Sequence, residues 1–379
     1  MTKKVVFSIV NLRPRKLGTV EEYCICLSKA LSEKGWRSIL GFAELPPPWL
    51  GTMFKDAGAV VEVMNVNQPL LPRFKALREI VGKHSVDIIH STFLDIFSLD
   101  TVFMKMSGVK KVIFSDQVSR VREDRFSIKD LIVRMKNKVT CRWIDMIIAD
   151  AEFIKKDLIE RCSADPKKIH VIFNGVNVRR FCAKYDREKR KKELGIPEDH
   201  HVVTTVAKCI PEKGIDIFLR AAKEVLKGED KVTFVIVGDG PLLEEMRTLA
   251  SSLGISKAVL FMGLRSDVDE ILAISDVFVL CSVWQEAFAF TLLEAMASGI
   301  PVVASDIGAI PESVQNGVTG ILFPPRDANA AADAINSLIA NAALRSQMGF
   351  AGRRRVEVRF SMDHWVNKTI EVYEKALAT

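Results

Sequence analysis

The sequence predicts an α/β protein built from two doubly wound, Rossmann-like parallel-sheet domains that face each other across a cleft. Three observations predict this architecture. The chain has 379 residues, which is more than a single hydrophobic core usually serves. Short apolar runs rich in β-branched residues alternate with helical patterns along nearly the whole length. A charged stretch at 179–201, which ends in a proline-containing turn, divides this alternation into two series.

Each series consists of short, mainly apolar runs, the pattern of parallel strands that helices cover on both faces. In the first series, strands are expected at 5–10, 38–42, 60–64, 87–91, 111–115, 146–150 and 169–174. In the second series, they are expected at 202–207, 232–239, 259–263, 277–281, 301–305 and 321–323.

The pause between the two series sets the expected domain boundaries. We expect a first domain over 1–178, a linker over 179–200 and a second domain over 201–358. The last helical pattern, within 359–379, follows a basic patch and is expected to pack back on the first domain. Ligands of doubly wound sheets bind at the carboxyl ends of the strands. The candidate site residues are therefore those that follow the strands.

The composition is that of a globular protein, with 48% hydrophobic and 27% charged residues. The seven cysteines are scattered and form no CxxC pair, which argues against a disulfide framework or a zinc ribbon and fits a reducing cytoplasm. Residues 1–16 resemble a signal peptide but lack a small-residue cleavage site, and we interpret them as a buried strand. No apolar run approaches the roughly 18 residues of a membrane span.

The formal net charge is +7, and part of the excess lies at 120–142, where eight basic residues accompany three acidic ones. This segment is either a solvated helical face or a surface that meets anionic lipid or an acidic substrate, as in peripheral membrane contact. Nucleic acid is not expected as a partner, because no nucleic-acid-binding motif accompanies the charge.

Two lysines, Lys208 and Lys213, lie in the loop after the strand at 202–207, and Gly214 opens an amphipathic helix. Ammonium groups beside a helix N-terminus can receive a diphosphate, through their charge and through backbone N–H groups. The alternative is a pair of surface lysines on a loop.

Glycine turns follow two further strands. In "VGDGPL" (237–242), Gly238 and Gly240 permit a tight strand-to-helix turn that is either structural or in contact with a nucleotide. The backbone of Gly263–Arg265 is a candidate floor for a nucleotide base. Asp267 is expected to cap the next helix rather than to bind a ligand.

Two glutamates, Glu286 and Glu294, lie in the apolar run "QEAFAFTLLEAMASG" (285–299), where an unpaired carboxylate is costly to bury. Glu286 is expected in the loop after the strand at 277–281, and Glu294 in the following helix. A fully helical segment would put the pair on roughly one side. The alternative is structural, with Glu286 in a cap region and Glu294 in an ion pair.

Paired carboxylates also permit a glycosidase, in which one acts as acid and the other as nucleophile or base. The lysine pair favours a leaving diphosphate instead, because a diphosphate needs cations more than a general acid. Carboxylates in such a site serve better as acceptors of hydrogen bonds from sugar hydroxyls.

In the first half of the chain, Gly18 and Thr19 form a turn before a helix and are expected to face the same cleft. His90 follows a strand and either lines the cleft or is a satisfied structural histidine. The segment "NGVN" (174–177) is expected to be a structural turn. Because no metal-binding histidine spacing and no Walker P-loop occurs, no metal and no cofactor is expected.

Several segments, taken together in their order and spacing, resemble the retaining glycosyltransferases of family 4, which have the two-domain GT-B fold. The segments are "KIHVIFNGVNVRRF", "PEKGID", "VGDGPL" and "EAFAFTLLEAMASGIPVVASDIGAIPESVQNGVTGILFPPRD", the last of which contains the family's paired glutamates. The similarity runs nearly end to end and is strongest from about 170 to 327.

The resemblance implies a role for each matching position. Lys208, where the family usually has Arg, and Lys213 would neutralise the leaving diphosphate, and Glu286 would hold the donor sugar. Glu294 would bind the ribose hydroxyls of the nucleotide. The further donor-binding residues would be Gly18, Thr19, Gly238, Gly263, Arg265, Phe288, Ala289, Phe290 and Thr291.

The sequence departs from the family pattern at several positions. Ala207 replaces the usual glycine before the first lysine, and Ala287 and Ala289 stand where the family has the glycines of "EGFG". The segment "VIFSDQ" (112–117) falls where many relatives have a cleft histidine, whose absence would alter acceptor handling or reduce activity. The acceptor-side candidates are His90, Asp116 and Gln117.

The resemblance therefore predicts a metal-independent, retaining glycosyltransferase that uses a nucleotide-diphosphate sugar. Its acceptor would be a glycan, a lipid-linked molecule or a small molecule, as in the synthesis of cell-surface polysaccharide. The alternatives are a sugar-nucleotide epimerase, a non-catalytic nucleotide-sugar binder and a nicotinamide oxidoreductase. The last is disfavoured because the first strand is followed by "NLRPRKLG" rather than by GxGxxG.

Overall fold

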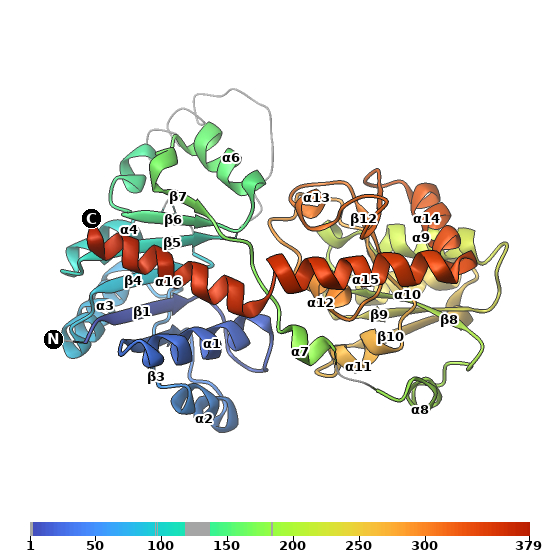
Figure 1. The fold of residues 1–379 in the computed structure, drawn as a ribbon, viewed down its shortest axis with the longest axis horizontal. Coiled ribbons are helices and arrows are strands. Elements are labelled where there is room, and N and C mark those ends of the chain that lie inside the picture. The colour runs from blue at the N-terminus through green and yellow to red at the C-terminus, as the bar shows by residue number, and fades with distance from the viewer. Residues whose placement is uncertain (1–2, 95, 97, 118–136, 183–184) are drawn as a thin grey trace. The chain divides into compact units, whose positions relative to one another are not determined.

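The structure is a computed structural model that describes residues 3–94, 96, 98–117, 137–182 and 185–379. The chain divides into two compact units, Met1–Asn174 with Met362–Thr379, and Gly175–Ser361. Each unit has one parallel sheet with helices packed on it (Figure 1). The predicted fold class, two Rossmann-like α/β domains, is confirmed.

The first unit contains, within the described residues, a seven-stranded sheet in the order β3-β2-β1-β4-β5-β6-β7, in which every pairing is parallel. Its strands are β1 (Val5–Val10), β2 (Arg37–Phe42), β3 (Ala59–Val63), β4 (Ile88–Thr92), β5 (Lys111–Asp116), β6 (Met146–Ala149) and β7 (Ile169–Val171). Its helices are α1 (Thr19–Glu33), α2 (Pro48–Asp56), α3 (Leu70–His84), α4 (Asp100–Met106), α6 (Glu152–Cys162), η1 (Pro166–Lys168) and α16 (Met362–Ala378).

The second unit contains, among the residues that the structure describes, a six-stranded parallel sheet in the order β10-β9-β8-β11-β12-β13. Its strands are β8 (His201–Val206), β9 (Val232–Val237), β10 (Val259–Gly263), β11 (Val277–Leu280), β12 (Val302–Ser305) and β13 (Gly320–Phe323). Its helices are α7 (Val178–Phe181), α8 (Arg187–Glu193), η2 (Pro211–Lys213), α9 (Ile215–Val225), α10 (Leu243–Ser252), η3 (Ser256–Ala258), α11 (Val268–Ala273), α12 (Phe290–Ala297), α13 (Ile310–Ser313), α14 (Ala328–Ala340) and α15 (Ala342–Arg359).

The central strands are buried because their residues are apolar on both faces, as the continuous hydrophobic runs predict. All six residues of β1 and all six of β9 are buried. Helix α9 buries one face against the second sheet, where the rings of Phe218 and Phe234 meet edge to face with their centroids 5.7 Å apart. Hydrophobic periodicity thus predicts both the helices and the strands. The loops that follow the strands lie at the carboxyl ends of the sheet.

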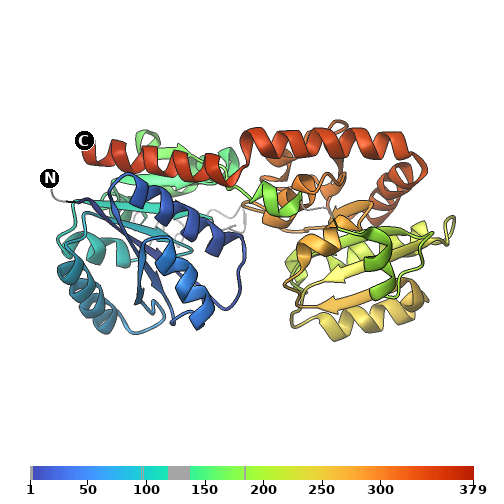
Figure 2. The ribbon, with the colours of Figure 1, turned by 60° about the horizontal axis from the view of Figure 1, so that its bottom comes forward.

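Helix α16 belongs to the first unit, where it packs along α1 (Figure 2). The rings of Tyr23 and Trp365 stack with their centroids 3.7 Å apart, and the Tyr23 hydroxyl donates to Oγ1 of Thr369 at 3.0 Å. The chain enters the second unit after Asn174 and leaves it at Ser361.

The boundaries of the units differ in detail from those expected. The first unit ends at Asn174 rather than at 178. The stretch 179–200, which the sequence led us to expect as a linker, contains part of α7 and all of α8 and belongs to the second unit. An ion pair of 3.0 Å between Arg187 of α8 and Asp276 before β11 fixes it there.

The basic segment 120–142 lies largely outside the described residues, since 118–136 are not among them. In the part of the chain that the structure describes, no helix is both long and apolar enough to cross a bilayer.

Candidate active site

The loops at the carboxyl ends of β8, β9, β11 and β12 are joined to one another by backbone hydrogen bonds. The loop after β8 accepts at the Glu212 carbonyl from Val283 N at 2.9 Å, and it donates from Cys209 N to the Asp239 carbonyl at 3.0 Å. The loop after β12 donates from Ala309 N to the Glu286 carbonyl at 2.9 Å. These bonds hold one cluster of loops over the edge of the sheet where ligands of doubly wound domains bind.

Glycines make this close loop packing possible. A Cβ atom on Gly214 would lie 2.0 Å from the carbonyl oxygen of Cys281, and one on Gly238 would lie 1.9 Å from that of Ala207. Both glycines also have positive φ, +59° and +140°. The loop packing is therefore sufficient to require a residue without a Cβ atom at position 238. The contact of Gly238 with the donor stays a prediction.

Glu286 lies at the centre of this loop cluster, and two side chains hold one of its oxygens. The ammonium of Lys213 lies 2.5 Å from Oε1 of Glu286, and the hydroxyl of Ser282 donates to the same oxygen. Ser282 is itself held through its carbonyl, which accepts from the Ser305 hydroxyl at 2.7 Å. Glu286 is 8% exposed. The carboxylate is therefore buried, paired and fixed in position.

The structure brings together Lys213 and Glu286, which the sequence singled out for separate reasons. Their positions are 73 residues apart, and no spacing rule connects them. Ser282 was missed, because a serine after an apolar strand carries no signal of its own. Its position directly after β11, at a strand carboxyl end, is the one feature that could have marked it.

Lys208 lies on the same loop as Lys213, two residues after β8, and its side chain is exposed. None of the ion pairs found among the described residues involves it. Its ammonium therefore remains available to a soluble anion, whereas that of Lys213 is already shared with a carboxylate.

Helix α12 begins at Phe290, so Glu286 precedes the helix and Glu294 lies inside it. The loop and helix placement expected from the sequence is thus found, but a fully helical register between the two glutamates does not exist. Phe288 is buried, and its ring meets that of Phe360 with the centroids 5.8 Å apart. The neighbouring candidates Ala289, Phe290 and Thr291 are half-buried at the N-terminal end of α12, where the helix dipole presents its positive pole.

Asp267 differs from expectation, whereas the predicted role of the Arg265 backbone stays a prediction. The sequence predicts that the Asp267 side chain caps α11, but this side chain makes no capping bond. It pairs instead with Arg265, at 2.8 Å from Nε to Oδ1, and with Arg190 of α8. The hydrogen bond from Arg265 lowers the pKa of Asp267. A Cβ atom added to Gly263, at φ +62°, would meet no atom within 4 Å, and the predicted contact of this backbone with a nucleotide base stays a prediction.

In the first unit, Gly18 is the N-cap residue of α1 and Thr19 its first residue. The side chain of Glu21 closes the cap, accepting from Gly18 N at 3.0 Å. Burial raises the pKa of Glu21. A Cβ atom at position 18 would approach this carboxylate to 2.9 Å, so the glycine gives the cap its room.

His90 lies inside β4 rather than after it, and it is 2% exposed. Its Nδ1 is 2.6 Å from the Tyr373 hydroxyl, and its Nε2 is 2.7 Å from the Ser115 hydroxyl. Burial lowers its pKa to about 4. Both nitrogens are therefore satisfied inside the unit, which corresponds to the structural reading of this histidine.

The other two acceptor-side candidates lie at the end of β5. Asp116 is 1% exposed, whereas Gln117 is half-buried and lines a small cavity with Tyr23, Trp365 and other side chains. The Gln117 amide donates to Asn174 Oδ1 at 2.8 Å, and the Asn174 amide donates to Asp150 at 3.3 Å. Asn174, which the sequence marks only as a turn, thus orders the carboxyl ends of β5, β6 and β7.

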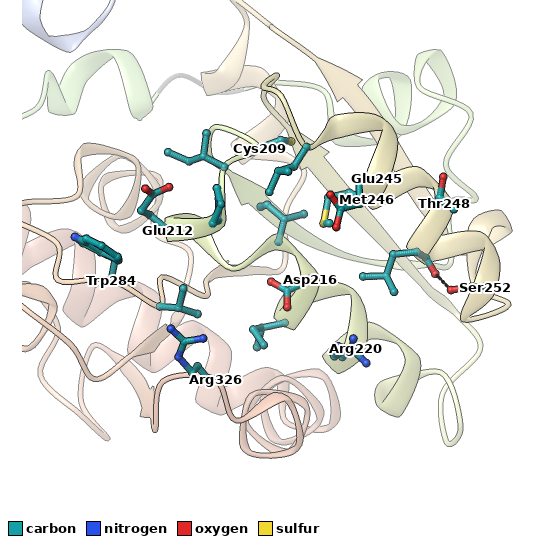
Figure 3. A pocket seen from close by; sticks show the side chains of 17 residues that line it. Cys209, Glu212, Asp216, Arg220, Glu245, Met246, Thr248, Ser252, Trp284 and Arg326 are labelled. Carbon is teal, nitrogen blue, oxygen red and sulfur yellow. Dashed lines mark hydrogen bonds between the residues drawn. The ribbon is translucent and has the colours of Figure 1, made fainter. Parts of the chain in front are cut away.

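A groove of about 690 Å³ opens beside the same loop cluster, between α9 and α10. Asp216 lies in its middle, with Trp284 and Arg326 on one side and Glu245 and Met246 on the other (Figure 3). Glu212 contributes to it from the loop after β8, whereas Lys208, Lys213, Glu286 and Glu294 do not line it. The groove therefore adjoins the candidate site but is not formed by the residues predicted to bind the donor.

Among the described residues, no three His, Cys, Asp or Glu side chains come together in a way that could hold a metal ion. The charged groups that meet at the loop cluster, Lys213 and Glu286, are suited to an anion and to hydroxyl groups.

Comparison with known proteins matches both halves of the chain to glycosyltransferases. Residues 186–355 match the family described as Glycosyl transferases group 1, and residues 20–180 match Glycosyltransferase Family 4. The chain is 30% identical over 270 residues to the UDP-Gal:alpha-D-GlcNAc-diphosphoundecaprenol alpha-1,3-galactosyltransferase of Escherichia coli, a match that covers 69% of this chain and 68% of the relative. It is 31% identical over 250 residues to the D-inositol 3-phosphate glycosyltransferase of Salinispora arenicola, of which the match covers 55%. The chain thus spans about half the length of some curated relatives.

Solved structures show the same fold. A glycosyltransferase from Rickettsia africae superposes with a TM-score of 0.84 at 22% identity, over 100% of this chain and 99% of that one. Anabaena HepE in complex with UDP superposes with a TM-score of 0.81 at 22% identity, over 98% and 100%. Together with the two family matches, these similarities establish that the chain belongs to family 4 of the glycosyltransferases and has the GT-B fold.

Proposed function

We propose that the protein is a retaining, metal-independent glycosyltransferase that transfers a sugar from a nucleotide-diphosphate sugar to a glycan, lipid-linked or small-molecule acceptor. The observation that carries this proposal is the Lys213–Glu286 pair at the carboxyl edge of the second sheet, in which a buried carboxylate is paired with a half-buried lysine. It places a cation for a phosphate next to an acceptor for sugar hydroxyls.

The lysines act on the leaving group. Negative charge grows on the diphosphate as the bond to the anomeric carbon breaks, and preorganised cations stabilise that charge. An ammonium carries three N–H donors. Lys213 can therefore keep its bond to Glu286 and still donate to a phosphate oxygen. Lys208, exposed on the same loop, supplies a second positive charge, and the N-terminal end of α12 adds its dipole.

The carboxylates position the donor. Only Oε1 of Glu286 is engaged by Lys213 and Ser282 in the hydrogen bonds described above, and we assign its Oε2 to a hydroxyl of the transferred sugar. Glu294, which lies inside α12, binds the ribose hydroxyls. We assign the backbone at Gly263 and Arg265 to the base. The assignment of Gly18 and Thr19 to the donor phosphate stays a prediction from the resemblance.

The names of the relatives support a nucleotide-sugar donor. The Escherichia coli relative is named for UDP-Gal, a relative in Mycolicibacterium smegmatis is described as GDP-mannose-dependent, and HepE was crystallised with UDP-glucose. These names favour a transferase over an epimerase or a non-catalytic binder. They differ in base, sugar and acceptor, so they support the donor class and no single donor. Polysaccharide synthesis at the cytoplasmic side of a membrane is the setting we propose.

The first test is a thermal-shift screen against a panel of UDP-, GDP- and ADP-sugars, because a ligand that binds the native state raises the melting temperature. The stabilising donor is then incubated with candidate acceptors, and nucleotide release is measured with and without EDTA. NMR of the product reports whether the anomeric configuration of the donor is kept. Conversion of the donor without any acceptor would identify an epimerase, and binding without nucleotide release across the panel would identify a non-catalytic binder.

A further inference from the structure

The groove between α9 and α10 takes no part in the proposed donor site, yet it has the size of a ligand site. Its volume of about 690 Å³ lies within the range of about 300–1,000 Å³ that small-molecule sites occupy. Part of its lining is apolar, since Met246 is buried and Leu242 and Leu249 are half-buried beside it. The polar groups of the groove decide which class of ligand fits.

Charged side chains of both signs line the groove (Figure 3). The carboxylates are those of Glu212, Asp216 and Glu245, and the guanidinium groups are those of Arg220 and Arg326. In the described parts of the chain, none of these five makes an ion pair or a side-chain hydrogen bond. Their hydrogen-bonding capacity is therefore left to water or to a ligand.

The neighbouring surface of α10 does not share this property. Glu244 and Arg247, which lie outside the groove, form an ion pair of 3.4 Å with each other. At the opposite wall, Arg326 has a positive φ of 70°, a backbone conformation that is unfavourable for a residue with a side chain. The groove therefore combines unpaired charges with a strained arginine, a combination typical of sites that bind something.

The mixture of charges selects the class of ligand. A phosphate or carboxylate would face three carboxylates, and a polyamine would face two guanidinium groups. A neutral molecule with many hydroxyl groups meets neither repulsion, because a hydroxyl donates to a carboxylate or accepts from a guanidinium. Trp284, half-buried at one side, adds a flat apolar ring on which the C–H face of a sugar can pack.

We propose that the groove between α9 and α10 is a binding site for a neutral oligosaccharide, separate from the donor site. A sugar ring lies against Trp284, and the hydroxyl groups bind the carboxylates of Asp216 and Glu245 and the guanidinium groups of Arg220 and Arg326. The oligosaccharide is either a stretch of the glycan that the enzyme extends or a free saccharide. Both sources present the same hydroxyl groups and C–H faces to the groove.

The groove shares two loops with the Lys213–Glu286 pair. Glu212 directly precedes Lys213, and Trp284 lies two residues before Glu286. A bond of 2.9 Å from Val283 N to the Glu212 carbonyl joins the two loops. A sugar that restrains both loops leaves less ordering to be done when the donor binds. This coupling rests on the proposed transferase function: the sugar should tighten donor binding, and the donor should tighten sugar binding by the same factor.

The test is isothermal titration calorimetry of the full chain with neutral hexasaccharides, namely maltohexaose, cellohexaose, mannohexaose and chitohexaose. We expect at least one of them to bind. Hexagalacturonate, which carries a carboxylate on each ring, should bind at least about ten-fold more weakly than the best neutral sugar. A chain that binds none of the neutral sugars, or that binds hexagalacturonate best, would overturn the proposal.

Two variants test whether the sugar lies in the groove. Asp216→Asn with Arg220→Gln removes one charge of each sign, and Trp284→Leu keeps an apolar side chain but removes the flat ring. Each variant should weaken sugar binding at least about ten-fold. The melting temperatures of the unliganded variants show whether they fold.

Matched controls remove the same kinds of group outside the groove. Glu244→Gln with Lys223→Gln removes one exposed charge of each sign from α10 and α9, and Trp49→Leu removes an exposed indole from the first unit. Both controls should bind the sugar like the wild type. Folded groove variants that bind it as tightly as the controls do would place the sugar elsewhere and overturn the proposal.

Thermal shift with the stabilising nucleotide sugar tests the coupling. In the wild type, the best hexasaccharide should lower the donor concentration at half-maximal shift at least about five-fold. The groove variants should keep the donor-induced shift but lose this effect of the sugar. An unchanged half-maximal concentration in the wild type would overturn the coupling. A failure of the transferase function would instead remove the donor-induced shift from the wild type and leave sugar binding intact.

Mass spectrometry of the bound hexasaccharide after incubation with the donor distinguishes its two sources. A sugar that gains mass is a stretch of the glycan that the enzyme extends, and a sugar of unchanged mass is a free saccharide.

Discussion

Nδ1 of His90 lies 2.6 Å from the hydroxyl oxygen of Tyr373, and the two rings meet edge to face with centroids 5.5 Å apart. The pair joins β4 to α16 inside the first unit. Because both residues are almost fully buried, the contact contributes to the stability of that unit and makes it depend on the protonation of the imidazole.

Acid should destabilise the first unit through His90. Burial lowers its pKa from 6.5 to about 4, so the unfolded chain binds the proton more readily than the folded one. The stabilisation is complete above pH 6.5 and is lost as the pH falls toward 4, by about 3 kcal/mol in total. Urea unfolding at several pH values in this window measures the slope.

The control for this prediction is His90→Gln, which does not titrate. Its unfolding free energy should depend less on pH, by about the same amount. His170, whose pKa burial also lowers, acts in the same direction in both proteins and cancels in the comparison. Equal slopes for the two proteins would show that His90 is not the group responsible.

Lys213→Ala should reduce nucleotide release by about 10²–10³-fold while the chain still folds, because it removes a preorganised cation from the leaving diphosphate. Steady-state assay of nucleotide release with the stabilising donor measures the effect. Lys223→Ala removes an exposed lysine from the opposite end of α9 and should leave the rate unchanged. A Lys213→Ala enzyme within a few-fold of the wild type would refute the assigned role.

Ser282→Ala should weaken donor binding about ten-fold, since Glu286 loses the hydroxyl that fixes its Oε1. Ser305→Ala is the matched control. It removes an equally buried hydroxyl at the end of β12, but one that bonds to the Ser282 carbonyl and not to Glu286. Thermal shift against donor concentration compares the two, and an equal loss of donor affinity in both variants would argue for a general loosening of the loops.

Gly238→Ala should destabilise the second unit by about 3 kcal/mol or more, since its Cβ would lie 1.9 Å from the Ala207 carbonyl oxygen. Gly254→Ala is the control, because Gly254 also has positive φ but has no atom within 4 Å of the added carbon. It should cost only about 1 kcal/mol, the penalty of the left-handed backbone. Denaturant unfolding measures the loss of unfolding free energy in both variants. Similar losses would mean that the loop at Ala207 moves to make room for the added carbon.

The fold could be predicted because its information is local. Runs such as "VTFVIV" are apolar on both faces, and they became the buried strands that hydrophobic periodicity indicates. The residues at which helices begin and end were harder to predict from the sequence. The run around Glu286 has helical character throughout, yet α12 starts only at Phe290, because Ala289 is extended and the Glu286 backbone is bonded to Ala309.

The candidate site could be predicted in its residue types but not in its pairings. Asp267 has the chemistry of a helix cap, but its carboxylate pairs instead with Arg265, two residues before it, and with Arg190, which the fold brings from 77 residues away. His90 stands at the end of an apolar run, as a ligand-binding histidine would, and its partner Tyr373 is 283 residues away. Contacts between residues so far apart in the sequence depend on how the helices and strands pack together. A short sequence motif carries no information about that packing.

The return of the chain to the first unit at Met362 also sets an order of events on the ribosome. The first unit buries three large side chains of α16, those of Trp365, Ile370 and Tyr373. The ribosome synthesises these residues only after all of Gly175–Ser361. The second unit can therefore finish folding first, while the nascent first unit keeps an uncovered apolar strip that chaperones would recognise. A ribosome that pauses near the 3′ end of the coding sequence would prolong the time for which this apolar strip is exposed.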